Sequence, residues 1–321
     1  MTPGEPRLCF VTGMHRSGTT WLGHATSAIT GTRLLDEPFH PNFGLRRVSD
    51  WYLDPDRLSD RDILFDGLRC LQDGTARFHR KVDLKRPLST ASVLVRGSGT
   101  ERAFHAFHRA PTAFMAIKDP FLLRMTPLLL ASGHRVIVSV RHPAAILRSL
   151  DRMGWRVSDR GTGDRIERMC AWWLDLYGPL LADPRVLRDQ GLFVVPHETV
   201  FLDTDRLGRA LAGFLGATDA GKASLDAFVS RSTRAKTVKP LHARQHDLAR
   251  DSVVLSSGWR ADWNMEVLSR FDRHVGASYA QFLAAGERCL DRASQSQTHH
   301  PEGSRASYPE KRDKPQAPAA Q

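Results

Sequence analysis

Cysteine is scarce in this sequence, and the few cysteines present follow no recognisable pattern. The four lie far apart, at Cys9, Cys70, Cys170 and Cys289, without a C-x-x-C pair. This spacing favours neither a disulfide framework nor a zinc site. Long apolar runs are missing as well, and without a run of roughly 18 apolar residues no membrane-spanning helix is expected.

Acidic residues are outnumbered by basic ones, 35 against 46, which gives a formal net charge of +11 at pH 7. A basic field attracts nucleic acid, anionic membranes or anionic small ligands, and charge alone does not choose among them. The basic residues form no stripe with interleaved aromatic residues, so a nucleic-acid partner is not expected. Residues 1–7 lack the apolar core of a secretory signal, so a cytoplasmic location is expected.

What the sequence does contain is a glycine-bounded loop between an apolar run and a helical pattern. The pattern predicts a buried strand over residues 8–11 and a helix over residues 18–29. Backbone N–H groups and the positive end of a helix dipole make such a loop an anion site. The spacing Gly13-x-x-x-x-Gly18 matches a P-loop, but Thr19 stands where a Walker A loop has lysine.

The missing lysine changes the kind of anion that we expect at this loop. The loop carries its cation inside, as Arg16, and nothing else in it suits a β/γ-phosphate pair. A phosphate or sulfate of lower charge therefore fits better than a triphosphate. An ordinary strand-to-helix turn without a ligand is the alternative reading of a lone glycine pair.

Charged residues follow three further predicted strands, at the point where each strand ends. They are Glu37 after the strand near residues 34–36, Lys118 after residues 113–117, and Arg141 after residues 135–140. Ligands of open α/β sheets lie beyond the carboxyl ends of the strands. We therefore expect all three close to the loop, although a surface turn or a simple ion pair would also account for such residues.

The alternation of strands with helices predicts an α/β fold of the P-loop NTPase type, with three layers and a mostly parallel central sheet. Residues 1–290 are expected to form a single domain, within which residues 42–110 are an insertion that shapes an acceptor pocket. Residues 231–250 are basic and irregular, and could cover an anionic ligand. Residues 291–321 have the composition of a disordered tail.

Three motifs, in order along the chain, resemble those of sulfotransferases that use 3′-phosphoadenosine 5′-phosphosulfate (PAPS). The run RSGTTW at residues 16–21 resembles the 5′-phosphosulfate loop of that family. Arg141, with Ser149 eight residues later, resembles its 3′-phosphate motif, and residues 258–260 resemble a late Trp-basic element. The resemblance extends over roughly residues 8–283 and is nearer to the bacterial and carbohydrate-type branch than to the cytosolic aryl and steroid type.

The resemblance implies a role for each matched residue. The implied nucleotide-binding residues are Arg16, Ser17, Gly18, Thr19, Thr20, Trp21, Arg141, Ser149, Trp259 and Arg260. The loop would hold the 5′-phosphate, Trp21 would stack on the adenine, and Arg16 would contact the sulfonate. Arg141 and Ser149 would bind the 3′-phosphate, with Trp259 and Arg260 beside it.

The implied catalytic residues are Glu37, Arg16 and Lys118, with Lys118 beside the transferring sulfonate. Two departures from the family matter. Arginine replaces the usual loop lysine, which keeps the charge but removes a proton donor at neutral pH. The general-base histidine of cytosolic members is also missing, because Pro120 stands at its position. Other branches use a glutamate, so Glu37 is the candidate base; Asp119 and His108 are alternatives.

The sequence thus predicts transfer of a sulfuryl group from PAPS to a hydroxyl of a carbohydrate, glycolipid or natural product, without a metal and with PAP as product. One alternative is an ATP-dependent kinase or phosphotransferase, which would need Mg²⁺. Another is a nucleotide-binding protein without catalytic activity. The pair Arg141 and Ser149 favours the sulfotransferase, since a 3′-phosphate site has no purpose in an ATP enzyme. The oligomeric state stays open.

Overall fold

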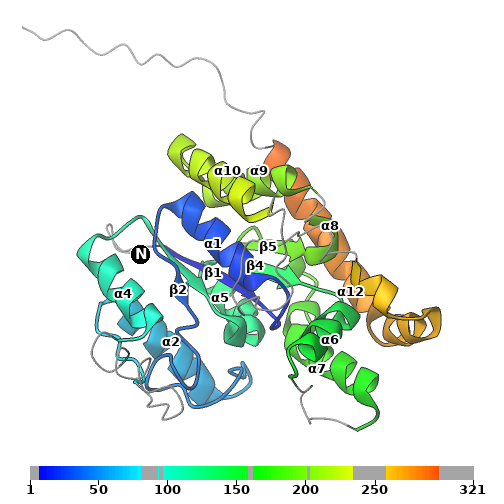
Figure 1. Cartoon of the computed structure of the whole chain (residues 1–321). Helices are drawn as coiled ribbons and strands as arrows, with labels where there is room; N and C mark the ends of the chain where they lie inside the picture. Colours follow the sequence, from blue (N-terminus) through cyan, green and yellow to red (C-terminus); the bar gives the residue numbers. More distant parts are fainter. Residues whose placement is uncertain are drawn as a thin grey trace, which may run out of the picture.

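The central feature of the fold is a parallel sheet with its first strand in the middle. The computed structural model describes residues 7–80, 93, 97–155, 157, 162–200, 203–233 and 258–295. Its strands are β1 (Arg7–Gly13), β2 (Leu35–Asp36), β3 (Phe114–Lys118), β4 (Arg135–Val140) and β5 (Leu192–Pro196). They pair in the order β2-β3-β1-β4-β5, so all carboxyl ends lie along one edge of the sheet (Figure 1).

Helices cover both faces of this sheet (Figure 1). They are α1 (Thr19–Thr30), α2 (Leu58–Gln72), α4 (Gly99–Arg109), α5 (Thr126–Ala131), α6 (Pro143–Arg152), α7 (Arg165–Leu181), α8 (His197–Val200), α9 (Thr204–Leu215), α10 (Asp219–Thr233) and α12 (Met265–Gln295), with short 3₁₀ turns η1 (Pro120–Met125), η2 (Val186–Arg188) and η3 (Gly258–Asp262). Helices α1, α9 and α10 lie on one face, and α5 and α7 lie on the other. Helix α12 packs against β5, α7 and α9.

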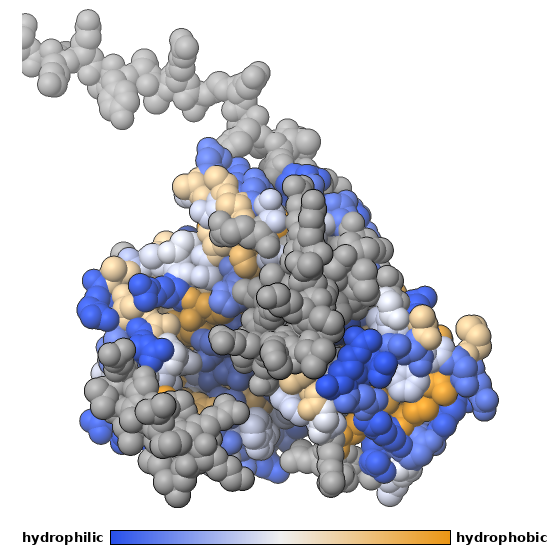
Figure 2. All heavy atoms as spheres, viewed as in Figure 1, coloured by the Kyte–Doolittle hydropathy of each residue, from blue (hydrophilic) through white to orange (hydrophobic). Residues whose placement is uncertain are grey.

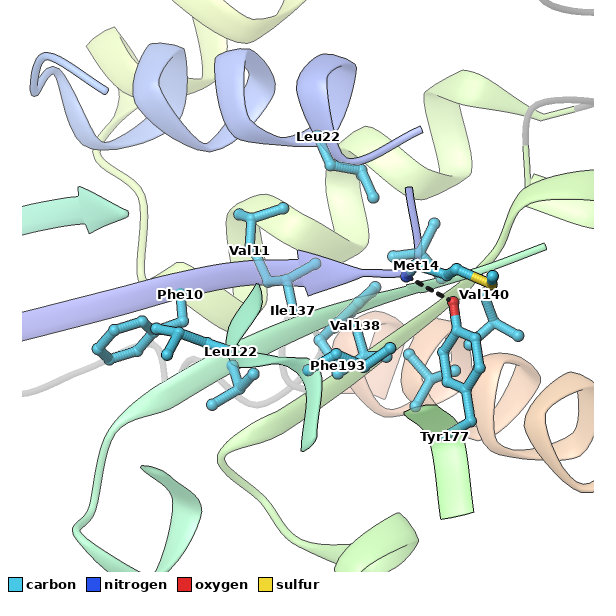
Figure 3. Packing of buried hydrophobic residues seen from close by; sticks show 14 of the residues in the cluster. Phe10, Val11, Met14, Leu22, Leu122, Ile137, Val138, Val140, Tyr177 and Phe193 are labelled. Carbon is cyan, nitrogen blue, oxygen red and sulfur yellow. Dashed lines mark hydrogen bonds between the residues drawn. The ribbon is translucent and has the colours of Figure 1, made fainter. Parts of the chain in front are cut away.

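The sheet is buried on both faces, which explains why its strands are apolar runs rather than alternating patterns. In β1 every residue after Arg7 is buried, and β4 is buried from Val136 onward. Figure 3 shows Leu22 of α1 and Tyr177 of α7 approaching the sheet from opposite sides. This two-sided core fixes the strand ends on which the site is built.

The predicted α/β fold with a central parallel sheet is confirmed. The end of the chain differs, because α12 continues to Gln295, five residues into the predicted tail. Helix α10 occupies the start of the region predicted to be irregular. The remaining parts of those two predictions, residues 234–250 and 296–321, lie outside the described residues.

The described part of the predicted insertion contains α2 and α4, and α4 packs against β2. The two helices lie together at the β2 side of the sheet (Figure 1). Figure 2 shows a largely hydrophilic surface on the same face, with apolar residues in smaller groups. Among the described helices, none has the length and apolar character needed to cross a membrane.

Candidate active site

The loop between β1 and α1 has the form of an anion site. Gly13 has φ of 150°, and a Cβ there would collide with the carbonyl oxygen of Ser139, so only glycine fits. Gly18, at φ of 99°, is the N-cap of α1. The helix begins without a side-chain cap and without an acidic residue in its first turn. Its first N–H groups and its dipole therefore point to a place for a bound anion.

A buried tyrosine, Tyr177, links the loop to β4 through two hydrogen bonds. The Tyr177 hydroxyl accepts a hydrogen bond from the Met14 amide (3.1 Å) and donates to the Ser139 carbonyl (2.6 Å), and Figure 3 shows the first of these bonds. The Ser139 hydroxyl in turn donates to the Ser17 carbonyl (2.5 Å). Burial raises the pKa of Tyr177, so the hydroxyl keeps its proton. The loop is thereby fixed to β4 and α7.

Arg16 connects the loop to the predicted 3′-phosphate residues. It has φ of 69°, a left-handed conformation that is uncommon outside glycine and that clusters at functional sites. Its Nε donates to the Ser149 hydroxyl on α6 (3.0 Å), and its carbonyl oxygen accepts from Arg141 Nη1 (3.0 Å). The fold thus brings Arg141 close to the loop, as expected for a residue at the carboxyl end of a strand, and it brings Ser149 of α6 to the Arg16 side chain.

Arg141 is supported by a carboxylate that the sequence reasoning missed. Its side chain is 11% exposed, and its Nε lies 3.9 Å from Oε1 of Glu198, which follows β5. The Glu198 carboxylate also accepts from the His142 amide (3.0 Å) and from the Tyr279 hydroxyl (2.5 Å). Burial lowers the pKa of Arg141 to about 10, which still leaves the guanidinium charged at neutral pH. Glu198 also lies just beyond the carboxyl end of a predicted strand, so the argument that led to Arg141 would have led to Glu198 as well.

The late Trp-basic element lies beside Arg141. Trp259 is buried and stacks on the His142 ring, with centroids 5.0 Å apart and ring planes at 15°. The Arg260 guanidinium lies 5.4 Å from the Trp259 ring centre. Burial lowers the pKa of His142 to about 4, so this imidazole is neutral at pH 7. Trp259 and Arg260 therefore lie at His142, the residue that follows Arg141 in the chain.

Trp21 has a different setting from the adenine platform that the resemblance implies. It is 7% exposed, its indole N–H donates to Ser232 on α10 (2.9 Å), and its ring lies 5.5 Å from Phe228. In the structure this tryptophan joins α1 to α10. Of the two threonines before it, Thr19 is buried and Thr20 is partly exposed in the first turn of α1.

Glu37 and Lys118 form an ion-paired group with Asp36 at the ends of β2 and β3. The Lys118 ammonium, 2% exposed, lies 2.5 Å from Oε1 of Glu37 and 2.9 Å from Oδ1 of Asp36. Burial alone would lower the pKa of Lys118, but the two carboxylates raise it, so the ammonium keeps its proton. Glu37 has φ of 54° and its side chain is 26% exposed.

The two alternative bases are held in structural contacts. The Asp119 carboxylate accepts the backbone amides of Phe39 (2.6 Å) and Phe121 (3.0 Å), and burial raises its pKa. His108 Nε2 lies 2.8 Å from the Leu71 carbonyl, between α4 and α2. Of the three candidates, Glu37 is the one paired with Lys118.

An aromatic cluster adjoins Glu37; its Trp51 and Tyr52 lie in the segment predicted to shape an acceptor pocket, whereas their packing on Phe121 was not predicted. The rings of His15, His40, Trp51 and Tyr52 contact Phe121, and Phe43 joins the cluster through His40. The rings of His40, Trp51 and Phe121 are 5.0–5.2 Å apart. The His40 amide donates to the Glu37 carbonyl (3.1 Å), which ties the cluster to the base candidate. Phe43 and Trp51 are 54% and 49% exposed, so this aromatic surface faces solvent.

No group of three or more histidine, cysteine, aspartate or glutamate side chains suited to a metal ion occurs within the described ranges. The four cysteines are free thiols.

A comparison with protein families identifies the class to which this site belongs. A family model described as the sulfotransferase family matches residues 9–220, more than half of the chain. The chain therefore belongs to the sulfotransferase family and is an enzyme of the transferase class, as the motif resemblance predicted. No curated protein matches the chain by sequence.

Solved structures with a similar fold are distant in sequence. Mouse sulfotransferase SULT7A1 complexed with PAP is 14% identical over 89% of this chain and 88% of that one, with a TM-score of 0.45. Sulfotransferase STF9 from Mycobacterium avium is 15% identical over 84% and 76%, with a TM-score of 0.40. The sulfotransferase domain from the curacin biosynthetic pathway is 13% identical over 84% and 98%, with a TM-score of 0.43.

Proposed function

We propose that this sulfotransferase moves a sulfuryl group from PAPS to a hydroxyl of a carbohydrate, glycolipid or natural-product acceptor. The observation that carries the proposal is the contact between two arginines, Arg16 and Arg141, at the carboxyl edge of the sheet. Arg16 beside the uncapped start of α1 and Arg141 at the end of β4 are joined through the Arg16 backbone, and Ser149 bonds to the Arg16 side chain. A nucleotide with anionic groups at its 5′ and 3′ positions suits such a pair of sites.

The residues of the nucleotide site fit PAPS in charge and position. The N–H groups of Gly18, Thr19 and Thr20 lie at the start of α1 and suit the 5′-phosphate. Arg141, with its planar fork of donors, suits the 3′-phosphate together with Ser149 and Arg260. PAPS, when bound, supplies the sulfuryl group that is transferred, and PAP remains as product.

The acid–base chemistry is assigned to the group at the ends of β2 and β3. Glu37 accepts the proton of the acceptor hydroxyl, a role worth about 10²–10⁴-fold in rate. Since Lys118 is already paired with two carboxylates, we assign to it mainly the positioning of Glu37. Arg16 then supplies the positive charge that stabilises the sulfonate.

The acceptor is expected to present the face of a ring to the aromatic cluster. Trp51 and Phe43 are half-exposed beside Glu37, and an exposed aromatic face suits a sugar ring or an aromatic ring. The acceptor hydroxyl would then lie between this surface and the Glu37 carboxylate.

The first experiment is a thermal-shift comparison of PAP with ATP, each with Mg²⁺ and with EDTA. We expect a rise in melting temperature with PAP that EDTA does not abolish. A panel of sugars, glycolipids and phenolic natural products then serves to identify the acceptor. Stabilisation by ATP and Mg²⁺ alone would instead support the phosphotransferase.

A further inference from the structure

We propose that His15 is a neutral hydrogen-bond donor to the transferring sulfonate and that Tyr52 fixes the tautomer on which this donor depends. The inference rests on the proposed function. It adds a second hydrogen-bond donor, beside Arg16, to the proposed sulfonate position. His15 lies in the loop immediately before Arg16, and Tyr52 comes from the segment that follows Glu37 in the chain. Neither residue belongs to the three motifs that resemble the sulfotransferase family.

The geometry of the pair is specific. His15 Nδ1 lies 2.5 Å from the Tyr52 hydroxyl, and the two rings meet edge to face. Tyr52 has φ of 57°; within the described ranges the other non-glycine residues with positive φ are Arg16 and Glu37. A left-handed conformation is unfavourable at such residues, and it persists where the surrounding structure imposes it. Three residues with this strain therefore converge on one site.

The chemistry of the two groups decides which nitrogen of His15 carries the proton. Burial and the charges of Lys118, His40 and Arg16 lower the pKa of His15 to about 3, so the ring is neutral and has one N–H. Burial raises the pKa of Tyr52 well above its usual value, so the phenol keeps its proton. A phenol donates more readily than it accepts, so the short bond runs from the Tyr52 hydroxyl to Nδ1 and leaves the proton of His15 on Nε2.

The Nε2–H group is available to a ligand. His15 is only partly buried, and in the part of the chain that the structure describes, the hydrogen bond found for its ring is the one at Nδ1. The ring lies 4.9 Å from Phe121 in the aromatic cluster and adjoins Arg16 in the chain. It thus stands between the predicted sulfonate and acceptor positions. A neutral donor there stabilises charge on a sulfonate oxygen without releasing its proton to the base.

Substitutions at His15 separate this role from packing. A glutamine amide reaches the position of Nε2 and an asparagine amide reaches only that of Nδ1. We expect His15→Asn to lower kcat about 10²-fold with little change in PAP affinity, and His15→Gln to recover part of the loss. The matched control is His134→Gln, at the amino end of β4 on the opposite edge of the sheet, which should leave kcat unchanged. Equal kcat values for the Asn and Gln variants would overturn the proposal.

Tyr52→Phe tests the tautomer itself. In ¹⁵N NMR spectra the wild-type His15 should carry its proton on Nε2, whereas the variant should show a mixture of tautomers and a lowered kcat. A wild-type ring protonated at Nδ1 would overturn the assignment, and so would an unchanged tautomer in the variant. The NMR result does not depend on turnover, so it stands apart from the transfer assay: absence of any transfer from PAPS counts against the proposed function instead.

Discussion

The Lys118 ammonium lies 2.5 Å from Glu37 and 2.9 Å from Asp36, so one buried cation holds two adjacent carboxylates. The register of the sheet produces this arrangement, because Asp36 of β2 pairs directly with Lys118 of β3. The two carboxylates have the same cationic partner but only one is the proposed base. They therefore offer a matched pair of substitutions for separating proton transfer from charge balance.

We expect Glu37→Gln to lower the rate of sulfuryl transfer by about 10²–10⁴-fold, because the variant has no group to accept the hydroxyl proton. PAP affinity, measured by calorimetry, should be unchanged. Asp36→Asn removes the same charge from Lys118 and should reduce the rate much less. Equal losses in the two variants would mean that the charge around Lys118, and not a base at Glu37, controls the rate.

Ser149→Ala should weaken PAP binding without changing the affinity for 5′-AMP, which lacks the 3′-phosphate. A hydrogen bond to a charged group contributes about 1.5–3 kcal/mol, which corresponds to roughly 10–150-fold in affinity. Ser132→Ala, at an exposed site after α5, is the matched control. A comparable loss of affinity for both nucleotides would place Ser149 elsewhere than at the 3′-phosphate.

Glu198→Gln should lower both PAP affinity and stability. The substitution removes the negative charge 3.9 Å from the buried Arg141 guanidinium, and removing one partner of a buried ion pair costs about 3–5 kcal/mol. Chemical denaturation measures the stability, and calorimetry with PAP and 5′-AMP measures the binding. Tyr279→Phe removes one bond to the same carboxylate but keeps its charge, so it should have the smaller effect. Unchanged PAP affinity in Glu198→Gln would show that Arg141 needs no such support.

The lowered pKa of His15 predicts a pH dependence of stability. Its value is about 3 in the folded chain and near 6.5 when unfolded, so between these pH values the unfolded chain binds the extra proton. The contribution of neutral His15 to the free energy of unfolding is therefore largest above about pH 6.5, and it decreases as the pH falls. The unfolding free energy of the wild type, relative to His15→Gln, should fall by about 2 kcal/mol between pH 7.5 and pH 5. A difference that does not change with pH would contradict the lowered pKa of His15.

The rule that ligands bind beyond the carboxyl ends of parallel strands predicted the parts of the site that lie at the sheet edge. Glu37 and Arg141 follow β2 and β4, Lys118 is the last residue of β3, and Arg16 lies in the loop after β1; parallel strands bring their carboxyl ends to one edge. The same reasoning applied to β5 leads to Glu198, whose supporting bonds cannot be read from spacing.

The remaining features depend on contacts between distant segments, for which the sequence carries no periodic signal. His15 and Tyr52 are 37 residues apart and meet only because the segment after Glu37 folds back over the loop. Trp21 fits the family motif, yet its contact with Ser232, 211 residues later, comes from a helix that was not predicted. Asp119 likewise accepts the Phe39 amide, 80 residues earlier in the chain, only through tertiary packing, whereas its bond to Phe121 is a local helix cap.

Transfer of a labelled sulfuryl group from PAPS, assayed in EDTA over a panel of hydroxyl acceptors, tests the proposed function most directly. We predict that label appears on an acceptor in a one-to-one ratio with released PAP, and that the Glu37→Gln variant binds PAP but transfers almost no label. Phosphate transfer from ATP with Mg²⁺, together with no transfer from PAPS to any acceptor, would contradict it.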